Sequence, residues 1–367
     1  MKSVLSALDL HYLIEEWKLL INAKLDKVFS NKEVFLFQFH APGVGKKYLK
    51  IILPSLAFIT EHKEEFGEID NFCVKLRKSL SGSRLRKIEQ KEFERIVEFV
   101  FEKKDEKYSL FIELFSTGNL ILCDKNLKIL MAYKYQNWAD RTIRGGIKYI
   151  YPKKEMNFFD FDEDKFIKFL SQANKNSIVV SLAKDLGLGG NYAEELCVIS
   201  EINKIKTELT SVEIKRLFEG MNELSSKKIE AVYYEKEGIF PFPMKSISDS
   251  YESLDSFNSI LDDKISKILE IKYKEKKNEK FDIKKSQLKG IIRQQEAQIK
   301  GLKKAIEENQ NKGDLVYHNY PMIEKIIIDL NKALKEKDIK EINKKIKGHK
   351  LIKKIDTKNK EITIDIS

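Results

Sequence analysis

Apolar positions near the start of the chain recur at helical spacing. Over residues 3–22 they form one face of a predicted amphipathic helix: Leu10, Leu13, Ile14, Trp17, Leu20 and Ile21. Ser6 and Asp9 stand three positions apart at the start of this segment, which is the pattern of a capping box. The sequence therefore predicts a capped helix at the N-terminus.

Between residues 27 and 151 the pattern changes to short runs rich in Val, Ile and Phe, separated by turn residues. These runs predict strands at residues 33–40, 47–54, 94–102, 108–115, 119–124 and 127–135. A helix is predicted to interrupt them at residues 72–79. Strands at this spacing are typical of a sandwich or a barrel.

Helical patterns return between residues 161 and 220, and a hairpin of strands is predicted to close this region near residue 245. Two of the helices flank a turn that contains Gly187, Gly189 and Gly190. Such a turn can aim backbone N–H groups at a phosphate. It can equally be the glycine C-cap that ends many helices. Both interpretations stay open.

A long helix with a heptad pattern follows. Its apolar positions recur at spacings of three, four and seven residues: Phe281, Leu288, Ile292, Ile299, Leu302 and Ile306. The helix is predicted to break at residues 311–314, to resume after Pro321, and to give way to a strand at residues 362–366. Because one heptad helix cannot bury its own apolar seam, this helix needs a partner.

The 367 residues are 42% hydrophobic, enough for packed cores in an α+β fold. Changes of pattern divide the chain at residues 1–160, 161–250, 251–350 and 351–367. No run approaches the length of a membrane span, and the N-terminus has no signal-peptide pattern. Cys73, Cys123 and Cys197 stand far apart, as in proteins of a reducing compartment. These features favour a soluble cytoplasmic protein without a membrane partner.

The net charge of +11 is unevenly distributed. Residues 264–360 contain 28 basic and 14 acidic residues, whereas residues 1–263 have a net charge of −1. A lysine-rich helix can meet a polyanion, or it can simply present a solvated face.

No pattern of catalytic or metal-binding residues is present. The five histidines are isolated from one another and from the cysteines. Residues 43–47 (GVGKK) lack the first glycine of a phosphate loop and the Ser or Thr that would bind magnesium. The sequence predicts no enzymatic activity, no cofactor and no metal site.

Five segments, in this order along the chain, resemble the NFACT family, the ribosome-quality-control proteins once called fibronectin-binding proteins in bacteria. They are SALDLHYLIEEWK, FCVKLRKSLSGSRLRKIEQKEFERIV, FIELFSTGNLILCD, LAKDLGLGGNYAEELC and GDLVYHNY. They span about residues 3–320.

The resemblance implies a MutM/Fpg-like N-terminal β-sandwich domain at 1–160, a helix–hairpin–helix domain at 161–250 and a long coiled-coil arm with its tip at 251–350. It also implies that the protein binds tRNA and the obstructed large ribosomal subunit and supports C-terminal tailing of stalled nascent chains. Glycosylase activity is not expected, because the chain begins Met1-Lys2-Ser3, without the N-terminal proline of those enzymes.

The resemblance places tRNA-binding residues at two positions. The early aspartate of the family matches Asp9, and its Asp-Arg dipeptide falls on Glu94-Arg95. Asp9 can also serve the capping box, and Glu94-Arg95 can be an exposed ion pair on a strand. In glutamate the carboxylate is displaced by roughly 1–1.5 Å relative to aspartate, a shift that matters at a positioned site.

Basic residues on both sides of this dipeptide are predicted to contact RNA phosphates. The first group is Lys75, Arg77, Lys78, Arg84, Arg86, Lys87 and Lys91. A second candidate patch is Arg141, Arg144 and Lys148, beside Tyr133, Tyr135 and Trp138. These aromatic rings either stack on splayed bases or belong to the core or its rim.

The resemblance also implies a returning coiled-coil arm and a C-terminal NFACT-R domain, which this sequence does not contain. Either the chain is truncated, or the gene is split and a second polypeptide supplies the rest. Two alternative functions remain: a coiled-coil scaffold, and a nucleic-acid-binding protein derived from a glycosylase-like fold without tailing activity.

Overall fold

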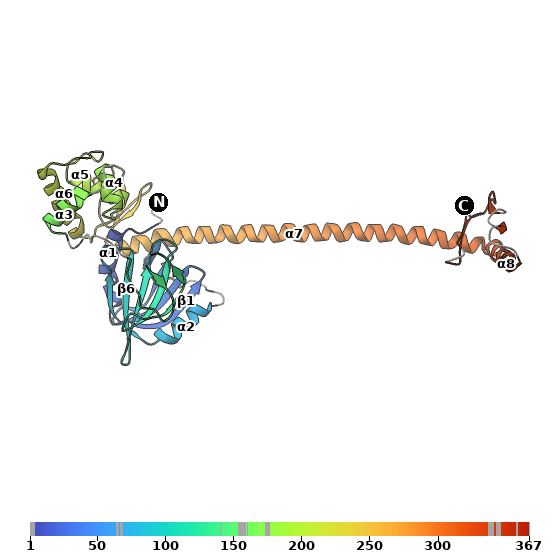
Figure 1. The fold of residues 1–367 in the computed structure, drawn as a ribbon, viewed down its shortest axis with the longest axis horizontal. Helices are drawn as coiled ribbons and strands as arrows, with labels where there is room; N and C mark the ends of the chain where they lie inside the picture. Colours follow the sequence, from blue (N-terminus) through green and yellow to red (C-terminus); the bar gives the residue numbers. More distant parts are fainter. Residues whose placement is uncertain are drawn as a thin grey trace. The chain divides into compact units, whose positions relative to one another are not determined.

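The computed structural model describes residues 4–63, 66, 69–139, 141–152, 159, 161–172, 177–336, 341–342, 346–356 and 359–366 (Figure 1). The chain forms two compact units, residues 1–271 and 272–367. The helices are α1 (Ala7–Trp17), a 3₁₀ turn (Lys18–Leu20), α2 (Asn71–Leu80), α3 (Glu163–Gln172), α4 (Ile178–Lys184), α5 (Gly190–Ile199), α6 (Ser211–Ser226), α7 (Phe257–His318) and α8 (Tyr320–Glu336).

Nine strands of the first unit form one antiparallel sheet in the order β4-β3-β2-β1-β5-β6-β7-β8-β9. They are β1 (Lys24–Asn31), β2 (Val34–Ala41), β3 (Gly45–Ile52), β4 (Leu56–Thr60), β5 (Arg84–Gln90), β6 (Ile96–Lys103), β7 (Glu106–Glu113), β8 (Asn119–Asp124) and β9 (Ile129–Ala132). The six predicted strands correspond to β2, β3 and β6–β9, and the predicted helix at 72–79 is α2. All are confirmed, with shifted ends.

The sheet consists of two halves, β4 to β1 and β5 to β9, which are joined by one residue pair in register and by backbone hydrogen bonds beside it, such as that from the Leu25 amide to the Ser83 carbonyl over 2.9 Å. Lys24 of β1 pairs with Arg84 of β5, whereas the other neighbouring strands pair over three to eight residues. Across the core, the rings of Phe39 in β2 and Phe101 in β6 stack with centroids 6.3 Å apart. The two halves therefore face each other across a shared core, as in a sandwich.

A second, smaller core lies on the outer face of the second half. Phe111 in β7 and Ile121 in β8 pack there against Ile143 and Tyr149, which follow the sheet in the chain. This segment includes the short strands β10 (Gln136–Asn137) and β11 (Thr142–Ile143). The segment that contains the second candidate patch is therefore part of a core.

Helix α1 connects the sheet to the helices that follow it. Ser6 and Asp9 form the predicted capping box, with the Asp9 amide donating to the Ser6 hydroxyl over 3.1 Å. On its other side, the Tyr12 hydroxyl donates to the carbonyl of Leu224, at the end of α6, over 2.5 Å. The predicted strand hairpin is β12 (Ala231–Tyr234) and β13 (Gly238–Phe240), and β14 (Tyr251–Leu254) joins it.

The first turn of α7 is held by α1 and β4. The Glu16 carboxylate accepts hydrogen bonds from the amides of Phe257 and Asn258, at 3.1 and 2.6 Å. The Asn258 side-chain oxygen accepts hydrogen bonds from the Ile59 amide over 2.7 Å and from the Trp17 indole. The Asn258 side-chain NH₂ donates to the Ile59 carbonyl, also over 2.7 Å. Side-chain caps thus replace the partners that the first amides of a helix lack.

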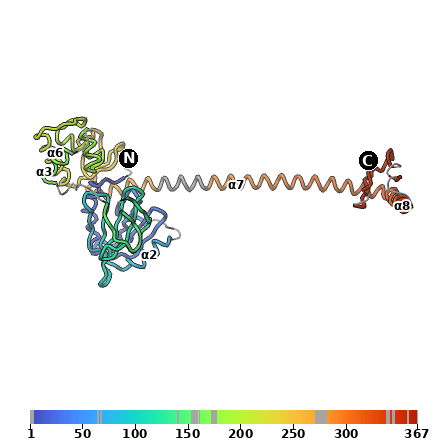
Figure 2. Tube along the Cα trace, viewed as in Figure 1, coloured from blue at the N-terminus to red at the C-terminus, as the bar shows by residue number. Residues whose placement is uncertain are grey.

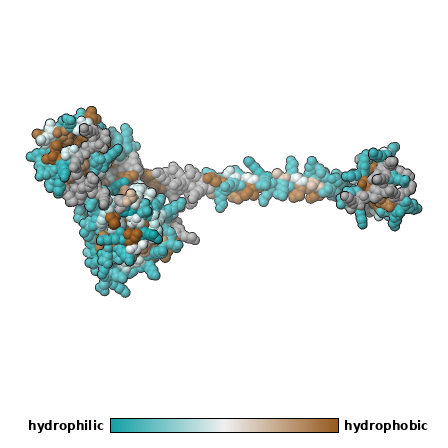
Figure 3. Space-filling view, viewed as in Figure 1, coloured by the Kyte–Doolittle hydropathy of each residue, from teal (hydrophilic) through white to brown (hydrophobic). Residues whose placement is uncertain are grey.

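The second unit contains most of α7, α8 and a strand pair, β15 (Ile352–Asp356) with β16 (Glu361–Ile364). The predicted break at residues 311–314 is wrong, because α7 continues through Gly313 to His318 (Figure 2). A glycine inside a helix is about 1 kcal/mol less favourable than an alanine, and the stability of the neighbouring helical turns outweighs this difference. The predicted seam is exposed, with Phe281, Leu288 and Ile306 each more than half accessible, and apolar residues lie among polar ones along the helix (Figure 3).

Candidate nucleic-acid interface

Asp9 lies at a buried junction rather than on the surface. Its side chain is 0% exposed. One carboxylate oxygen accepts hydrogen bonds from the Ser6 amide and hydroxyl, both at 2.7 Å, and the other accepts from the Tyr192 hydroxyl of α5 over 2.5 Å. Burial, followed by the charge of Asp9, raises the pKa of Tyr192 well above its usual value. Asp9 therefore positions α1 against α5.

Glu94 and Arg95 lie in the turn that enters β6, and this turn is tied to α1. The Gln90 side-chain amide donates to the carbonyls of Ala7 and Glu94, at 2.8 and 2.9 Å. The Arg95 carbonyl accepts from the Leu114 amide over 2.8 Å. One side chain thus fixes the Glu94-Arg95 turn beside the start of the helix that carries Asp9. Gln90 was not singled out from the sequence, since it has no local pattern that distinguishes it.

The Arg95 guanidinium is half-buried, and no ion pair or side-chain hydrogen bond joins it to any residue that the structure describes. Burial lowers the pKa of Arg95 from its usual value, against the opposing charge of the adjacent Glu94. Most partly desolvated charges are paired, so an arginine without such a partner is a candidate for ligand binding.

The basic residues between positions 75 and 91 do not form one patch around Glu94-Arg95, contrary to the prediction. Leu85 pairs with Phe101 near the far end of β6, whereas Arg95 precedes that strand. At about 3.3 Å per residue, Arg86 and Arg95 are therefore about 20 Å apart along the strand.

Several of these residues are already engaged. Arg86 pairs with Glu102 at 2.6 Å, Lys87 with Glu89 at 2.7 Å, and Lys91 with Glu89 and Glu98 at 2.8 and 2.7 Å. Burial alone would lower the pKa of Lys91, but its hydrogen bonds to the two glutamates raise it above its usual value. Arg77 donates to the Val28 carbonyl and lies over the Phe29 ring. Lys75, Lys78 and Arg84 remain exposed without an ion pair among the described residues.

Arg141 is a correction to the second predicted patch. Its side chain is 3% exposed and forms a bidentate pair with Glu113, at 2.6 and 3.0 Å. The Tyr149 hydroxyl also donates to Glu113, and the guanidinium lies 4.5 Å from the centre of the Trp138 ring. A guanidinium enclosed in this way is a structural group of the second core and does not present its charge to a ligand.

Arg144 and Lys148 are exposed, as expected for phosphate contacts. Arg144 lines a shallow surface hollow of about 690 Å³ together with Tyr135 and Ile147. Tyr135 is 64% exposed and free to stack on a base, whereas Tyr133 packs edge-on against Phe35 in the main core. Of the three aromatic residues predicted here, only Tyr135 is exposed, whereas Tyr133 and Trp138 are partly buried.

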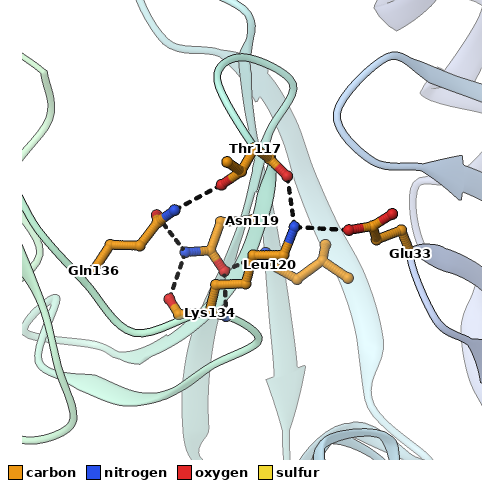
Figure 4. A network of polar contacts seen from close by, with 6 residues as sticks. All are labelled: Glu33, Thr117, Asn119, Leu120, Lys134 and Gln136. Carbon is orange, nitrogen blue, oxygen red and sulfur yellow. Dashed lines mark hydrogen bonds and ion pairs between the residues drawn. The ribbon is translucent and has the colours of Figure 1, made fainter.

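A polar network holds Lys134 and Gln136, the residues on either side of Tyr135 in the sequence (Figure 4). The side-chain NH₂ of the buried Asn119 donates to the Lys134 carbonyl at 2.8 Å, and its side-chain oxygen accepts from the Lys134 amide at 3.0 Å. The Lys134 ammonium reaches Glu33 at 3.0 Å and the Thr117 carbonyl at 2.8 Å, and Gln136 donates to the Thr117 hydroxyl. The segment FIELFSTGNLILCD, which resembles the NFACT family, thus has a structural role here.

The predicted glycine turn joins α4 to α5. Gly187 and Gly189 have φ values of 81° and 79°, a region that favours glycine, and Gly190 begins α5. The Gly189 amide donates back to the Ala183 carbonyl over 3.1 Å, as in a helix C-cap. Both earlier interpretations are compatible with this geometry.

Among the described residues, there is neither a metal-binding cluster nor a candidate membrane-spanning helix. No group of three or more His, Cys, Asp or Glu side chains could hold a metal ion. No described helix combines the length and the apolar character that crossing a membrane requires.

Residues 6–364 match the family described as NFACT N-terminal and middle domains. The archaeal Rqc2 homolog aRqcH of Methanocaldococcus jannaschii is 31% identical over 99% of this chain and 57% of that protein. The ribosome quality control complex subunit NEMF of Homo sapiens is 24% identical over 91% of this chain and 34% of that protein. The chain thus spans between a third and three-fifths of the length of these relatives.

Solved structures support the fold. The N-terminal part of the fibronectin/fibrinogen-binding protein from Streptococcus suis has a TM-score of 0.60 at 21% identity, covering 71% of this chain and 99% of that one. The fibrinogen binding protein from Staphylococcus aureus has a TM-score of 0.59 at 20% identity, covering 70% of this chain and 97% of that one.

Proposed function

The chain belongs to the NFACT family, and on that premise we propose that it acts in ribosome quality control by binding RNA. Its ligands would be tRNA and the obstructed large ribosomal subunit, and its role would be to support C-terminal tailing of stalled nascent chains. The archaeal relative is an Rqc2 homolog and the human relative is a ribosome quality control complex subunit, and both support this proposal. The protein would work by binding and positioning in the cytoplasm, where ribosomes translate, and not by catalysis.

Arg95 is the observation that supports RNA binding most directly. It is half-buried, its pKa is lowered by that burial, and it forms no ion pair with a described residue. The surrounding turn is fixed to α1 through Gln90. A half-buried guanidinium on a fixed turn, without an ion pair among the described residues, is suited to bind a phosphate or a base edge.

Substituting Arg95 tests the proposal. A hydrogen bond to a charged group contributes about 1.5–3 kcal/mol. Arg95→Ala should therefore weaken binding of tRNA and of large subunits roughly tenfold to a hundredfold. The matched control is Arg216→Ala, which removes from α6 an arginine that pairs with Glu201. Filter binding and co-sedimentation at moderate salt measure both variants.

Equal binding by Arg95→Ala and wild type would contradict the proposal, provided that both unfold at the same temperature. If Arg95→Ala and Arg216→Ala weakened RNA binding equally, the effect would come from the overall charge of the protein. This result would also contradict the proposal.

Glu94 adds a second test. Glu94→Asp shortens the side chain by one methylene and restores the dipeptide that the family resemblance implies, moving the carboxylate by roughly 1–1.5 Å. We expect the variant to bind tRNA as wild type does and to change the yield of tailed nascent chain in a reconstituted reaction. An altered tRNA affinity with unchanged tailing would contradict a role for Glu94 in tailing.

The finer architecture is also part of this proposal. We propose that the α4–α5 turn, with Gly187, Gly189 and Gly190, is a helix–hairpin–helix element that offers backbone amides to RNA. We also propose that the N-terminal domain before it is glycosylase-like in fold. Lys75, Lys78, Arg84 and Arg144 would add phosphate contacts, since all four are exposed. Asp9 would act on RNA through the placement of α1 and α5, because its carboxylate is buried.

The exposed seam of α7 favours a second candidate function, a coiled-coil scaffold. Apolar side chains such as Leu288, Ile299 and Leu302 are more than half exposed along α7. We propose that another helix covers them, in the same polypeptide or in a second one. Light scattering tests this: Leu288→Gln with Leu302→Gln should lower the measured mass if a second chain covers the seam. A monomer in both proteins at high concentration would contradict the scaffold function.

A further inference from the structure

Four basic side chains stand side by side across the sheet, one on each of four neighbouring strands. In the strand register, Lys46 of β3 lies opposite His40 of β2, and His40 lies opposite Lys24 of β1. Lys24 also lies opposite Arg84 of β5, at the junction of the two sheet halves. We call Lys24, His40, Lys46 and Arg84 the basic row.

The basic row faces away from the core. Directly opposite residues of an antiparallel pair share one face of a sheet, and successive residues alternate between faces. The neighbours Phe39, Leu25 and Leu85 are fully buried in the main core. All four members of the row are exposed.

No acidic partner neutralises the row among the described residues, since none of its four members forms an ion pair there. Glu102 lies directly opposite Arg84 in the register, but its carboxylate pairs with Arg86 at 2.6 Å. Asp26 accepts a hydrogen bond from Gln38 at 3.4 Å. Lys24 and Arg84 are like charges directly opposite each other, an arrangement that destabilises a sheet. Folding therefore gains nothing from this arrangement, whereas a bound polyanion would relieve the repulsion.

The arginine end of the row is held in a fixed position. Arg84 donates to the backbone carbonyl of Asn22 at 3.1 Å, and Arg86 donates to the Asn22 side chain at 2.8 Å. A side chain that is already restrained loses less conformational entropy when it binds a ligand.

The spacing of the row fits a nucleic-acid backbone. Three steps between strands, each about 4.8 Å, give a row about 14 Å long. A row of this length can contact several consecutive phosphates of one nucleic-acid strand. The one aromatic ring in the row is the His40 imidazole, and none of the four side chains is aliphatic or suited to enter a lipid bilayer. Contacts of this kind bind the backbone and do not depend on base sequence.

We propose that the basic row binds the sugar–phosphate backbone of RNA, as a second contact separate from Glu94-Arg95. This inference rests on the proposed function, because that function supplies RNA as the ligand. In the strand register, Arg84 lies opposite Glu102, near the end of β6, whereas Arg95 precedes the first residue of β6. The two contacts are thus about 20 Å apart at about 3.3 Å per residue, so one extended RNA can reach both.

The test is a salt titration of RNA binding with the full chain. Lys24→Gln with Lys46→Gln removes two charges from the row, and Lys32→Asn with Lys215→Gln removes two exposed charges elsewhere. Each lost phosphate contact lowers the slope of log K against log salt by about 0.7–0.9. The slope of log K against log salt should therefore be lower by about 1.5 in the row variant than in wild type. The loss of affinity should be the same for tRNA, for large subunits and for unrelated RNA of the same length as the tRNA. The control pair should match wild type.

Thermal unfolding without RNA gives an independent readout. Because the row places like charges opposite each other, the row variant should unfold at the same temperature as wild type or a higher one. A lower unfolding temperature would mean that the lysines stabilise the fold, and would overturn the inference.

The other outcomes separate the inference from the proposed function. If wild type binds RNA and the row variant keeps the same slope, the basic row is not an RNA site and only the inference fails. If wild type binds neither tRNA nor large subunits, the proposed function fails and the inference fails with it. Binding of phosphatidylserine vesicles that only the row variant loses, with RNA binding unchanged, would assign the row to a membrane and overturn the inference.

Discussion

The Tyr192 hydroxyl donates a hydrogen bond to the Asp9 carboxylate over 2.5 Å and so joins two helices that are 183 residues apart in sequence. Both side chains are almost completely inaccessible to solvent. The same carboxylate caps α1 through Ser6. Any effect of Asp9 on a ligand therefore comes from the relative placement of α1 and α5.

Tyr192→Phe should destabilise the first unit. The substitution removes a donor to a buried carboxylate, at a cost of about 1.5–3 kcal/mol. For a unit of this size, each kcal/mol lowers the unfolding temperature by about 2–4 °C. Calorimetry measures the change against Tyr135→Phe, whose ring is 64% exposed. If the two variants unfold at the same temperature, the hydrogen bond contributes no net stability.

Arg141→Gln should destabilise the protein far more than Arg144→Gln. The first substitution breaks the bidentate pair and leaves Glu113 at 2% side-chain exposure without its counter-charge, at a cost of about 3–5 kcal/mol. The second changes an exposed residue. Urea unfolding measures the difference. We expect Arg144→Gln to weaken RNA binding moderately, and we expect the folded fraction of Arg141→Gln to bind RNA as wild type does.

Gly118→Ala should destabilise the sheet more than Gly43→Ala. Both glycines have a positive φ, 68° and 73°, so the backbone strain of an alanine is similar at the two positions. At Gly118 a Cβ atom would also lie 2.7 Å from the Cα of Pro54, whereas at Gly43 it would meet nothing within 4 Å. The difference in free energy of unfolding therefore measures the close approach of the β7–β8 and β3–β4 turns. Equal losses would mean that the turns move apart at little cost.

Protonation of His11 should lower stability below neutral pH. Burial lowers the pKa of His11 from 6.5, against the raising effects of the Ser225 carbonyl and Glu15. The unfolded chain thus takes up a proton at a higher pH than the folded protein. Stability is full above the unfolded pKa and falls as the pH drops from about 6.5 toward the folded value. In urea titrations between pH 7.5 and pH 5.5, His11→Gln should lose less stability than wild type, and His62→Gln should follow wild type.

The sequence predicted those parts of the fold in which the apolar pattern is strong and local. The capping box at Ser6 and Asp9 and the helix at 72–79 are examples, since each depends on residues three or four positions apart. Strands β1, β4 and β5 were not predicted. β1 and β5 are rich in charge, and they form because neighbouring strands supply hydrogen-bond partners and a buried face.

The candidate site was less predictable, because charge in a sequence does not reveal its partner. Arg141 pairs with Glu113, which is 28 positions earlier, and a basic local context gave no sign of this. Conversely, Lys24, His40 and Lys46 have no local pattern in common, and only the register of three strands makes them neighbours. Contacts of this kind depend on tertiary structure.

The single residue pair between β1 and β5 has a thermodynamic consequence. The basic row crosses from one sheet half to the other at this pair, Lys24 and Arg84. A strand of RNA bound along the row would contact both sheet halves at this junction. A ligand that binds only the folded state raises its stability by mass action, so RNA and the joined halves would stabilise each other.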